Sequence, residues 1–240
     1  MNLSIFIPAY NASPFIESVI RRIPDDVRQS INHIYIINDG SIDATATVVN
    51  KLAERDATIV PIHFTDNTGY GAAVKEGLRH CKTDGCDYAL CLHADGQYPP
   101  EQIASGVERM AHAGLDIMQG SRIASGTALS GGMPLYKFIA NRMLTRLENI
   151  VFRLRMTDYH SGMLFYSRKA LDTLPFCTFS NSFDFDVEVI ACSRARNLAV
   201  GEMPIPTHYG DEQSHVRSIP YGFRVLRVVF DYIRGKYSQV

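Results

Sequence analysis

The sequence lacks several features that mark specialised classes of protein. It has no tryptophan, and 24 basic residues against 25 acidic ones leave a formal net charge of -1 at pH 7. A chain without a basic excess has no general attraction for nucleic acid, so we expect no nucleic-acid partner. Its apolar runs fall short of the roughly 20 residues that a membrane-spanning helix needs. What remains, 46% hydrophobic and 20% charged residues, is typical of one globular domain.

The cysteines do not form the pattern of a disulfide framework. There are five, an odd number, and no C-x-x-C pair. Several lie within apolar runs, where cysteine behaves as a small buried hydrophobic residue. The first residues, MNLSIFIPAYN, lack the charged segment of a signal peptide and break at Pro8. We therefore expect a reducing, cytoplasmic location.

Short apolar runs alternate with helical patterns along the first half of the chain. Each run has the length and composition of a strand buried on both faces. The segments between them carry apolar residues at helical spacing. This order predicts an α/β fold with a mostly parallel sheet flanked by helices. The predicted strands are residues 3–8, 33–38, 59–64, 88–92 and 115–120.

Polar loops follow four of these predicted strands. The carboxyl ends of parallel strands meet at one edge of a sheet, and ligands of such folds bind there. We therefore expect the four loops to converge on one ligand. They are PAYN (8–11), NDGSID (38–43), NTGYGAA (67–73) and HADGQ (93–97).

The fourth loop has the spacing of a metal site. His93, Asp95 and Gln97 are two residues apart, so on extended backbone their side chains point the same way. The oxygens of Asp95 and Gln97 suit Mg²⁺ or Mn²⁺, and a histidine ligand would shift the preference towards Mn²⁺. In the alternative interpretation, His93 caps the strand or binds a phosphate and Asp95 alone holds the metal.

The second half of the chain has a different character. A glycine- and serine-rich loop (121–134) precedes a predicted basic helix at about 135–155, and a predicted helix at 183–196 carries acidic residues. The end of the chain, 221–237, has an apolar face with Phe223 and Phe230 beside arginines. Such a segment lies in a membrane interface, on its own domain or on a second subunit. Peripheral membrane contact and a homodimer both remain open.

The motifs taken together resemble the family 2 glycosyltransferases of GT-A fold, and within them the dolichol-phosphate mannose synthase-like branch. The resemblance covers about residues 1–210. It implies a single Rossmann-like GT-A domain at 1–210, with a nucleotide-sugar-binding half at 1–120, an acceptor half at 121–210 and a C-terminal amphipathic helical tail at 211–240. The motifs that carry it are PAYN, NDGSID, NTGYGAA, HADGQYPPE, GSR (120–122), DYHSGM (158–163) and EMPIP (202–206).

The resemblance implies an inverting transfer of a hexose from a UDP- or GDP-sugar, assisted by Mn²⁺ or Mg²⁺. We expect the nucleotide to be bound by Pro8, Tyr10, Asn11, Asp39, Gly69, Lys75 and Ala94. The expected metal ligands are His93, Asp95 and Gln97, and the expected catalytic residues are Asp95, Arg122, Asp158 and Asp186. The acceptor side is expected to use Ser161, Gly162, Arg142 and Glu188.

Several of these residues also have a purely structural interpretation. Asp39 would then cap the following helix, Asp158 would form a tight turn, and Asp186 or Glu188 would be a satisfied helix carboxylate. Lys75 is either a surface lysine or, because a lysine is unfavourable in a first helical turn, the neighbour of an anion.

The favoured acceptor is a polyprenyl or dolichyl phosphate. A phosphate is already ionised near neutral pH and attacks C1 unaided, whereas a hydroxyl needs a general base. The predicted basic helix suits such a lipid at the inner face of a membrane. The alternatives are a saccharide or other small hydroxyl acceptor, and a catalytically silent nucleotide-sugar-binding module. A dinucleotide site at GYGAAV (69–74) is disfavoured, because Val74 occupies the third glycine position of that fingerprint.

Overall fold

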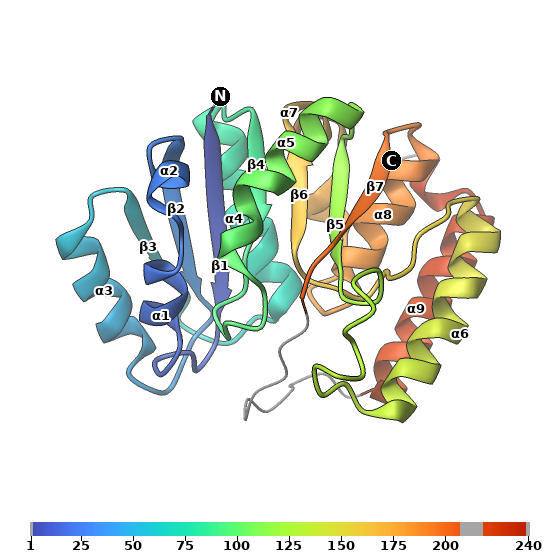
Figure 1. The fold of residues 1–240 in the computed structure, drawn as a ribbon, viewed down its shortest axis with the longest axis horizontal. Helices are drawn as coiled ribbons and strands as arrows, with labels where there is room; N and C mark the ends of the chain where they lie inside the picture. The colour runs from blue at the N-terminus through green and yellow to red at the C-terminus, as the bar shows by residue number, and fades with distance from the viewer. Residues whose placement is uncertain (1, 207–217, 239–240) are drawn as a thin grey trace.

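The computed structural model describes residues 2–206 and 218–238, which fold around a seven-stranded sheet (Figure 1). The strand order is β3-β2-β1-β4-β6-β5-β7. Only β6 runs antiparallel to its neighbours, so the predicted mostly parallel sheet is confirmed. The strands are β1 (Leu3–Ala9), β2 (Ile31–Asn38), β3 (Ile59–His63), β4 (Tyr88–Cys91), β5 (Ile117–Ser121), β6 (Leu164–Ser167) and β7 (Val200–Pro204).

Helices cover both faces of this sheet, in the layered arrangement that buries two-sided apolar strands. One face is covered by α1 (Ile16–Arg21), α3 (Thr45–Arg55) and α5 (Ile103–Ala113). The other is covered by α4 (Tyr70–Asp84), α7 (Arg168–Thr173) and α8 (Phe185–Ala195), with α6 (Leu135–Phe152) and α9 (Ser218–Ile233) at the end of the molecule (Figure 1). The short helix α2 is Asp25–Arg28, and 3-10 turns lie at Pro100–Gln102, Phe176–Thr178 and Lys236–Ser238.

The two hydrophobic cores follow the twofold period of a strand. In β1, Ile5 and Ile7 pack with α1, α3 and α5, whereas Phe6 between them packs with α4 and α8. Gly77 of α4 explains how closely that helix approaches, because a Cβ there would lie 2.5 Å from the Phe6 ring. Gly106 of α5 plays the same part on the other face, with a Cβ 2.4 Å from the Phe165 ring. The sheet edge that carries the polar loops is thereby held between two well-packed layers.

The C-terminal helix packs through a different face from the apolar one that the sequence suggested. Val225, Val228 and Val229 are buried, whereas Phe223 is 70% exposed and Phe230 is 56% exposed. The apolar face predicted from the sequence therefore does not pack on its own domain. Helix α9 begins at residue 218; the rest of the predicted tail, 211–217 and 239–240, lies outside the described residues. Within the described part, no helix is long and apolar enough to cross a membrane.

Candidate functional site

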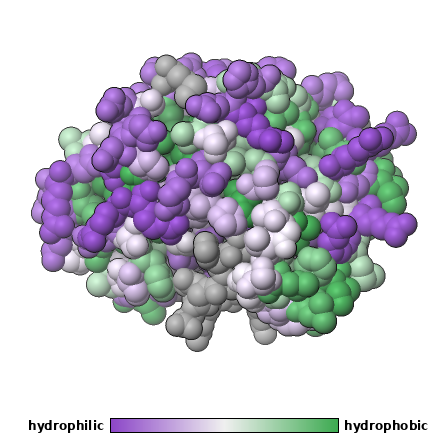
Figure 2. All heavy atoms as spheres, viewed as in Figure 1, coloured by the Kyte–Doolittle hydropathy of each residue, from purple (hydrophilic) through white to green (hydrophobic). Residues whose placement is uncertain are grey.

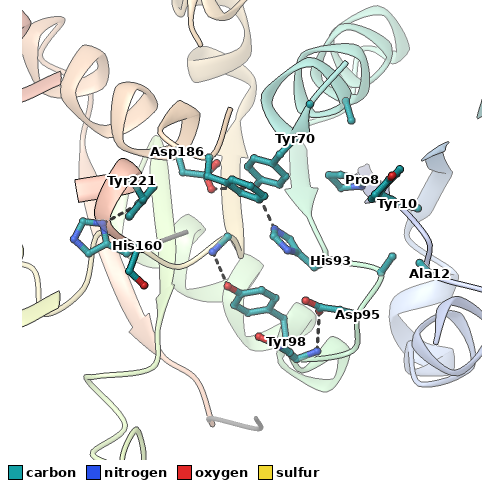
Figure 3. Close-up of a pocket in the computed structure, with 18 of the residues that line it drawn as sticks. Pro8, Tyr10, Ala12, Tyr70, His93, Asp95, Tyr98, His160, Asp186 and Tyr221 are labelled. Carbon is teal, nitrogen blue, oxygen red and sulfur yellow. Dashed lines mark hydrogen bonds between the residues drawn. The ribbon is translucent and has the colours of Figure 1, made fainter. Parts of the chain in front are cut away.

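A cavity of about 700 Å³ opens at the carboxyl ends of β1, β2 and β4 and extends to α6 and α9 (Figure 3). The polar loops predicted from the sequence converge here. The predicted site residues that line it are Pro8, Tyr10, Asn11, Asp39, Gly69, His93, Ala94, Asp95, Gln97, Arg122, Gly162 and Asp186. Five other predicted site residues are not among the described residues that line the cavity: Lys75, Arg142, Asp158, Ser161 and Glu188.

The loop after β1 is locked to the loop after β2. Asn11 has a left-handed backbone, with φ at 50°, a conformation that asparagine tolerates better than most residues. Its backbone N–H donates to Ser41 Oγ at 2.9 Å, and its Oδ1 accepts from the N–H of Ile42 at 3.0 Å. Asn11 therefore fixes how Pro8 and Tyr10 face the cavity.

Asp39 organises the loop after β3. Its Oδ1 accepts from the N–H of Thr68 at 2.7 Å and from the Thr68 hydroxyl at 2.9 Å, and its Oδ2 accepts from the N–H of Gly69 at 3.0 Å. A carboxylate has about four acceptor positions, so Oδ2 retains one for a ligand. Asp39 does not cap the following helix α3; the side chain at that N-terminus is Asp43, whose Oδ1 accepts from the N–H of Thr45 at 2.9 Å. The predicted contact of Asp39 with the nucleotide stays a prediction.

The glycines of NTGYGAA serve a close approach between two segments of this chain. A Cβ on Gly69 would lie 2.4 Å from the carbonyl oxygen of Asn181, and one on Gly71 would lie 2.3 Å from that of Ser180. Lys75, one turn further along α4, donates to the Phe179 carbonyl and to Asn181 Oδ1. The start of α4 is thus docked on the 179–181 segment, and Lys75 supports that contact outside the cavity.

His93 turns its ring towards the interior of the domain (Figure 3). The Tyr70 hydroxyl donates to Asp186 Oδ2 at 2.9 Å, which leaves its oxygen to accept from His93 Nε2 at 3.1 Å. Burial lowers the pKa of His93, so the ring is neutral at pH 7. Gly162 makes room for it, since a Cβ there would lie 2.1 Å from Nε2. Nε2 therefore has a protein partner, and direct ligation of metal by His93 stays a prediction.

Asp186, at the start of α8, is a buried carboxylate that faces the cavity. Burial raises its pKa from 3.8 to about 7, although the hydrogen bond from Tyr70 opposes the rise. Its Oδ1 is buried and has no hydrogen-bond partner among the described residues. An acceptor atom in this state is ready for a ligand hydroxyl or carries the proton itself.

Asp95 and Gln97 supply oxygen atoms at the wall of the cavity. The backbone N–H of Gln97 donates to Asp95 Oδ1 at 3.0 Å, which fixes the turn of the loop. The described residues contain no group of three His, Cys, Asp or Glu side chains with metal-site geometry. One carboxylate and one amide oxygen nevertheless fit Mg²⁺ or Mn²⁺, since such ions are often held by one or two protein carboxylates with phosphate oxygens and water completing the shell.

Arg122 lines the cavity and is held by the loop at 158–160 and by Tyr98. Its Nη2 donates to the His160 carbonyl at 2.8 Å, its Nε lies 4.0 Å from Asp158 Oδ2, and its guanidinium lies over the Tyr98 ring. Asp158 is fully buried and accepts from Asn141 Nδ2 at 2.8 Å and from the N–H of His160 at 2.9 Å. Asp158 therefore acts on the site through Arg122 and its loop.

The four predicted acceptor residues are each placed differently. Ser161 is fully buried, and its carbonyl accepts from Gln119 Nε2 at 2.6 Å. Arg142 is exposed on α6, outside the cavity lining. Glu188 accepts from the N–H of Ser180 and from the Tyr237 hydroxyl, so it holds the 180 loop and the C-terminal segment together. The backbone of Gly162 contributes to the site by donating to the Tyr98 hydroxyl at 2.8 Å.

Several residues that build the site were absent from the sequence predictions. Tyr70 and Tyr98 hold His93 and Gly162, and Lys137 of α6 and Tyr221 of α9 line the far end of the cavity. Lys137 belonged to the predicted basic helix, but whether its side chain reaches the cavity depends on how α6 packs.

His160 is another site residue that was not among the residues predicted from the sequence. Its Nδ1 pairs with the Tyr221 hydroxyl at 2.9 Å and its Nε2 lies 3.3 Å from Glu148 Oε2 (Figure 3). Burial alone would lower the pKa of His160, but the carboxylates of Glu148 and Asp158 raise it above its ordinary value. His160 thus ties α6, through Glu148, and α9, through Tyr221, to its own loop, and the His160 carbonyl in that loop accepts from Arg122.

Comparison with known proteins gives one family. Residues 4–174 match the model of glycosyl transferase family 2. The chain is 27% identical over 236 residues to UDP-N-acetylglucosamine--dolichyl-phosphate N-acetylglucosaminyltransferase of Methanococcus voltae, covering 92% of each chain. It is 24% identical over 203 residues to the polyprenol monophosphomannose synthase of Mycolicibacterium smegmatis, covering 84% of this chain and 75% of that one.

Solved structures share the fold. The TM-score is 0.70 with glucosyl-3-phosphoglycerate synthase from Mycobacterium tuberculosis in complex with Mn²⁺, UDP and phosphoglyceric acid, at 16% identity and covering 100% of this chain and 79% of that one. It is 0.65 with a mannosyltransferase from Pyrobaculum calidifontis in complex with GDP-Man and Mn²⁺, at 15% identity and covering 100% of this chain and 65% of that one. The family model spans more than half of the chain. The chain therefore belongs to glycosyl transferase family 2, as a glycosyltransferase of GT-A fold, and its relatives fit the predicted dolichol-phosphate mannose synthase-like branch.

Proposed function

We propose that this enzyme transfers a hexose from a UDP- or GDP-sugar to a polyprenyl or dolichyl phosphate, with inversion at C1. One observation carries the proposal: a single cavity joins the strand-end loops, with Asp95 and Arg122, to a second end built by α6 and α9. Two relatives named for transfer to a dolichyl phosphate or a polyprenol phosphate support the acceptor. Neighbours of the same fold in complex with UDP or GDP-Man support the donor.

The donor would lie at the strand-end loops. Pro8, Tyr10 and Asn11 would form one wall of the nucleoside site. Asp39 also lines the cavity and has an acceptor position left for the nucleotide. Asp95 and the Gln97 amide oxygen would hold a divalent cation there. When bound, Mn²⁺ or Mg²⁺ supplies positive charge beside the diphosphate of the donor.

Arg122 is the cation that this chain itself provides at the reacting centre. The bond from C1 to the donor diphosphate breaks, and the electron pair stays on the leaving phosphate oxygen. A guanidinium aimed at that oxygen stabilises the transition state more than the ground state. The His160 carbonyl and the Tyr98 ring hold Arg122 in place, so little reorganisation is needed during the reaction.

The acceptor phosphate would lie at the other end, near Lys137. This lysine occupies the first turn of α6, lines the cavity and makes no ion pair with the described residues. A helix N-terminus together with a lysine suits an anion. One phosphate oxygen then forms the new bond to C1 from the face opposite the leaving diphosphate, and it needs no general base because it is already ionised.

Asp186 would orient the sugar between these two ends. Its unpartnered Oδ1 is placed to accept a hydrogen bond from a sugar hydroxyl, which would compensate the buried atom. The Tyr70 hydroxyl fixes the other oxygen, so the carboxylate has one orientation. Binding by a buried, oriented group of this kind favours a defined hexose over its epimers.

The test combines nucleotide binding with transfer. UDP, GDP, CDP and dTDP are titrated by calorimetry with and without Mn²⁺, and transfer from UDP- and GDP-sugars to a polyprenyl phosphate is followed with labelled sugar. We expect one diphosphate to bind selectively and more tightly with metal. In Asp95→Ala we expect this gain to vanish and kcat to fall about 100-fold or more, in line with the removal of charge stabilisation from a transition state.

Asp25→Ala is the matched control, because Asp25 is fully exposed on α2, away from the cavity. Wild-type turnover by Asp95→Ala would contradict the metal site. Transfer to a saccharide but not to the lipid phosphate would favour a hydroxyl acceptor, and nucleotide binding without any transfer would favour a silent binding module.

A further inference from the structure

Large hydrophobic side chains are exposed mainly on one pair of helices. Of the 13 such side chains among the described residues, ten lie on α6 and α9, which pack against each other. Figure 2 shows hydrophobic surface at the lower right of the molecule, where Figure 1 draws the lower ends of α6 and α9. The α6–α9 face is defined here as Leu135, Tyr136, Ile139, Met143, Ile150, Ile219, Phe223, Leu226, Phe230 and Ile233.

Positive charge accompanies this apolar surface although the whole chain is close to neutral. The two helices carry Lys137, Arg142, Arg146, Arg224 and Arg227. Within the described part of the chain, Arg142, Arg146 and Arg227 form no ion pair. Concentrated apolar surface beside unpaired cations is the character of an interfacial helix that meets anionic lipid.

The acidic groups on these helices do not offset that charge. Glu148 is buried against His160, and Asp231 is paired with Lys236 at 2.8 Å. A bilayer with anionic lipid attracts each exposed cation, whereas in a twofold dimer the same surface would meet its own copy and bring like charges together. The charge pattern therefore favours a membrane over a second subunit as the occupant of this face.

The mouth of the cavity lies on the same surface. Tyr136 is 63% exposed and also lines the cavity, and Ser218 and Tyr221 of α9 line it from the other helix. A lipid whose phosphate lay beside Lys137 would therefore leave the cavity next to the exposed apolar side chains. This step rests on the proposed function; the exposed surface and its charge do not.

We propose that the α6–α9 face rests in the interface of a membrane that contains anionic lipid, with the mouth of the cavity turned towards the bilayer. The apolar side chains enter the boundary between headgroups and acyl chains, and the arginines contact the headgroups. The enzyme would then meet a lipid phosphate without extracting it from the membrane.

The test is flotation of the whole chain with vesicles, in the absence of donor and acceptor. We expect the protein to float with vesicles of phosphatidylcholine and phosphatidylglycerol, and to float less with phosphatidylcholine alone or at high salt. Phe223→Ser with Phe230→Ser, and separately Arg146→Glu with Arg227→Glu, should each weaken partitioning about tenfold or more. The controls on the other side of the molecule are Ile42→Ser, at 88% exposure, and Arg109→Glu on α5.

The four altered side chains are exposed, so circular dichroism and thermal melts should match the wild type. Equal flotation of the wild type and both double variants would overturn the proposal, as would a wild type that stays unbound. A wild type that is dimeric by light scattering, and monomeric after the phenylalanine changes, would assign the face to a second copy. Transfer to a short, water-soluble prenyl phosphate is measured in parallel. A wild type that does not transfer sugar to this acceptor contradicts the proposed function alone. Variants that no longer float but still transfer sugar to it support the membrane role of the α6–α9 face.

Discussion

The two ends of the cavity are built differently. At the donor end, short loops follow strands β1, β2, β3 and β4. Asn11 joins the first of these loops to the second, and Asp39 joins the second to the third. At the acceptor end, the lining comes from side chains of α6 and α9, which His160 joins by contacting Glu148 on α6 and Tyr221 on α9. Strand ends fix a loop by local geometry, whereas a helix presents whichever face its packing dictates.

This difference predicts where each end is vulnerable. The donor end depends on close backbone approaches, so it should tolerate little added volume. The acceptor end depends on buried ionisable groups, so it should respond to pH and to the loss of single polar atoms. The junction between them is the Tyr70, His93 and Asp186 group, which joins α4, β4 and α8.

The largest of the stability effects is expected at the junction. In Gly162→Ala the new Cβ would lie 2.1 Å from His93 Nε2, and the ring is held by the Tyr70 hydroxyl and by the edge of Tyr98. Forced repacking of a filled interior should lower the free energy of unfolding by about 3 kcal/mol. Urea unfolding followed by circular dichroism measures it.

Gly222→Ala is the control for that substitution. Gly222 lies within α9, and a Cβ there would meet no atom within 4 Å. Alanine should raise the free energy of unfolding by about 0.5–1 kcal/mol, because it loses less conformational freedom in a helix. A Gly162→Ala protein as stable as the wild type would mean that the His93 ring is free to move. The junction would then not be a tightly packed part of the cavity wall.

A smaller effect is expected from Asp186, and it depends on pH. Its pKa is about 7 in the folded protein against 3.8 ordinarily, so between these values the folded state keeps a proton that the unfolded chain has released. This group therefore makes the protein less stable as pH rises from about 4 to about 7. Asp186→Asn removes the effect, and between pH 5 and pH 8 the wild type should lose about 2 kcal/mol relative to the variant.

Urea unfolding of both proteins at several pH values measures that difference. Asp25→Asn, on the exposed surface of α2, is the control and should follow the wild type at every pH. Parallel pH profiles for wild type and Asp186→Asn would show that the carboxylate is not held in a poorly solvated site.

Much of the fold and of the donor end could be predicted from the sequence, because both depend on neighbours in the chain. Alternating apolar runs specify the sheet, and residues at strand ends such as Pro8, Asp39 and Asp95 follow from the strands themselves. The antiparallel direction of β6, its place between β4 and β5, and the partners of Tyr70 and Glu148 could not be predicted in this way. They are set by contacts between residues far apart in sequence, for which a local pattern carries no signal.

The smallest effect is expected from Lys75, which the sequence assigns to the donor end and the structure places outside the cavity lining. The sequence predicts that it binds the nucleotide, whereas in the structure its Nζ donates to the Phe179 carbonyl and to Asn181 Oδ1, segments about a hundred residues away. In Lys75→Ala we expect the Kd for the selected nucleoside diphosphate to change by no more than about a factor of two, since residues without a shared partner contribute independently. Calorimetry measures the Kd, and Lys51→Ala on the exposed surface of α3 is the control. A tenfold loss of affinity in Lys75→Ala alone would mean that α4 meets the nucleotide after all, and that the local signal of a lysine in a first helical turn outweighs the contacts in the folded chain.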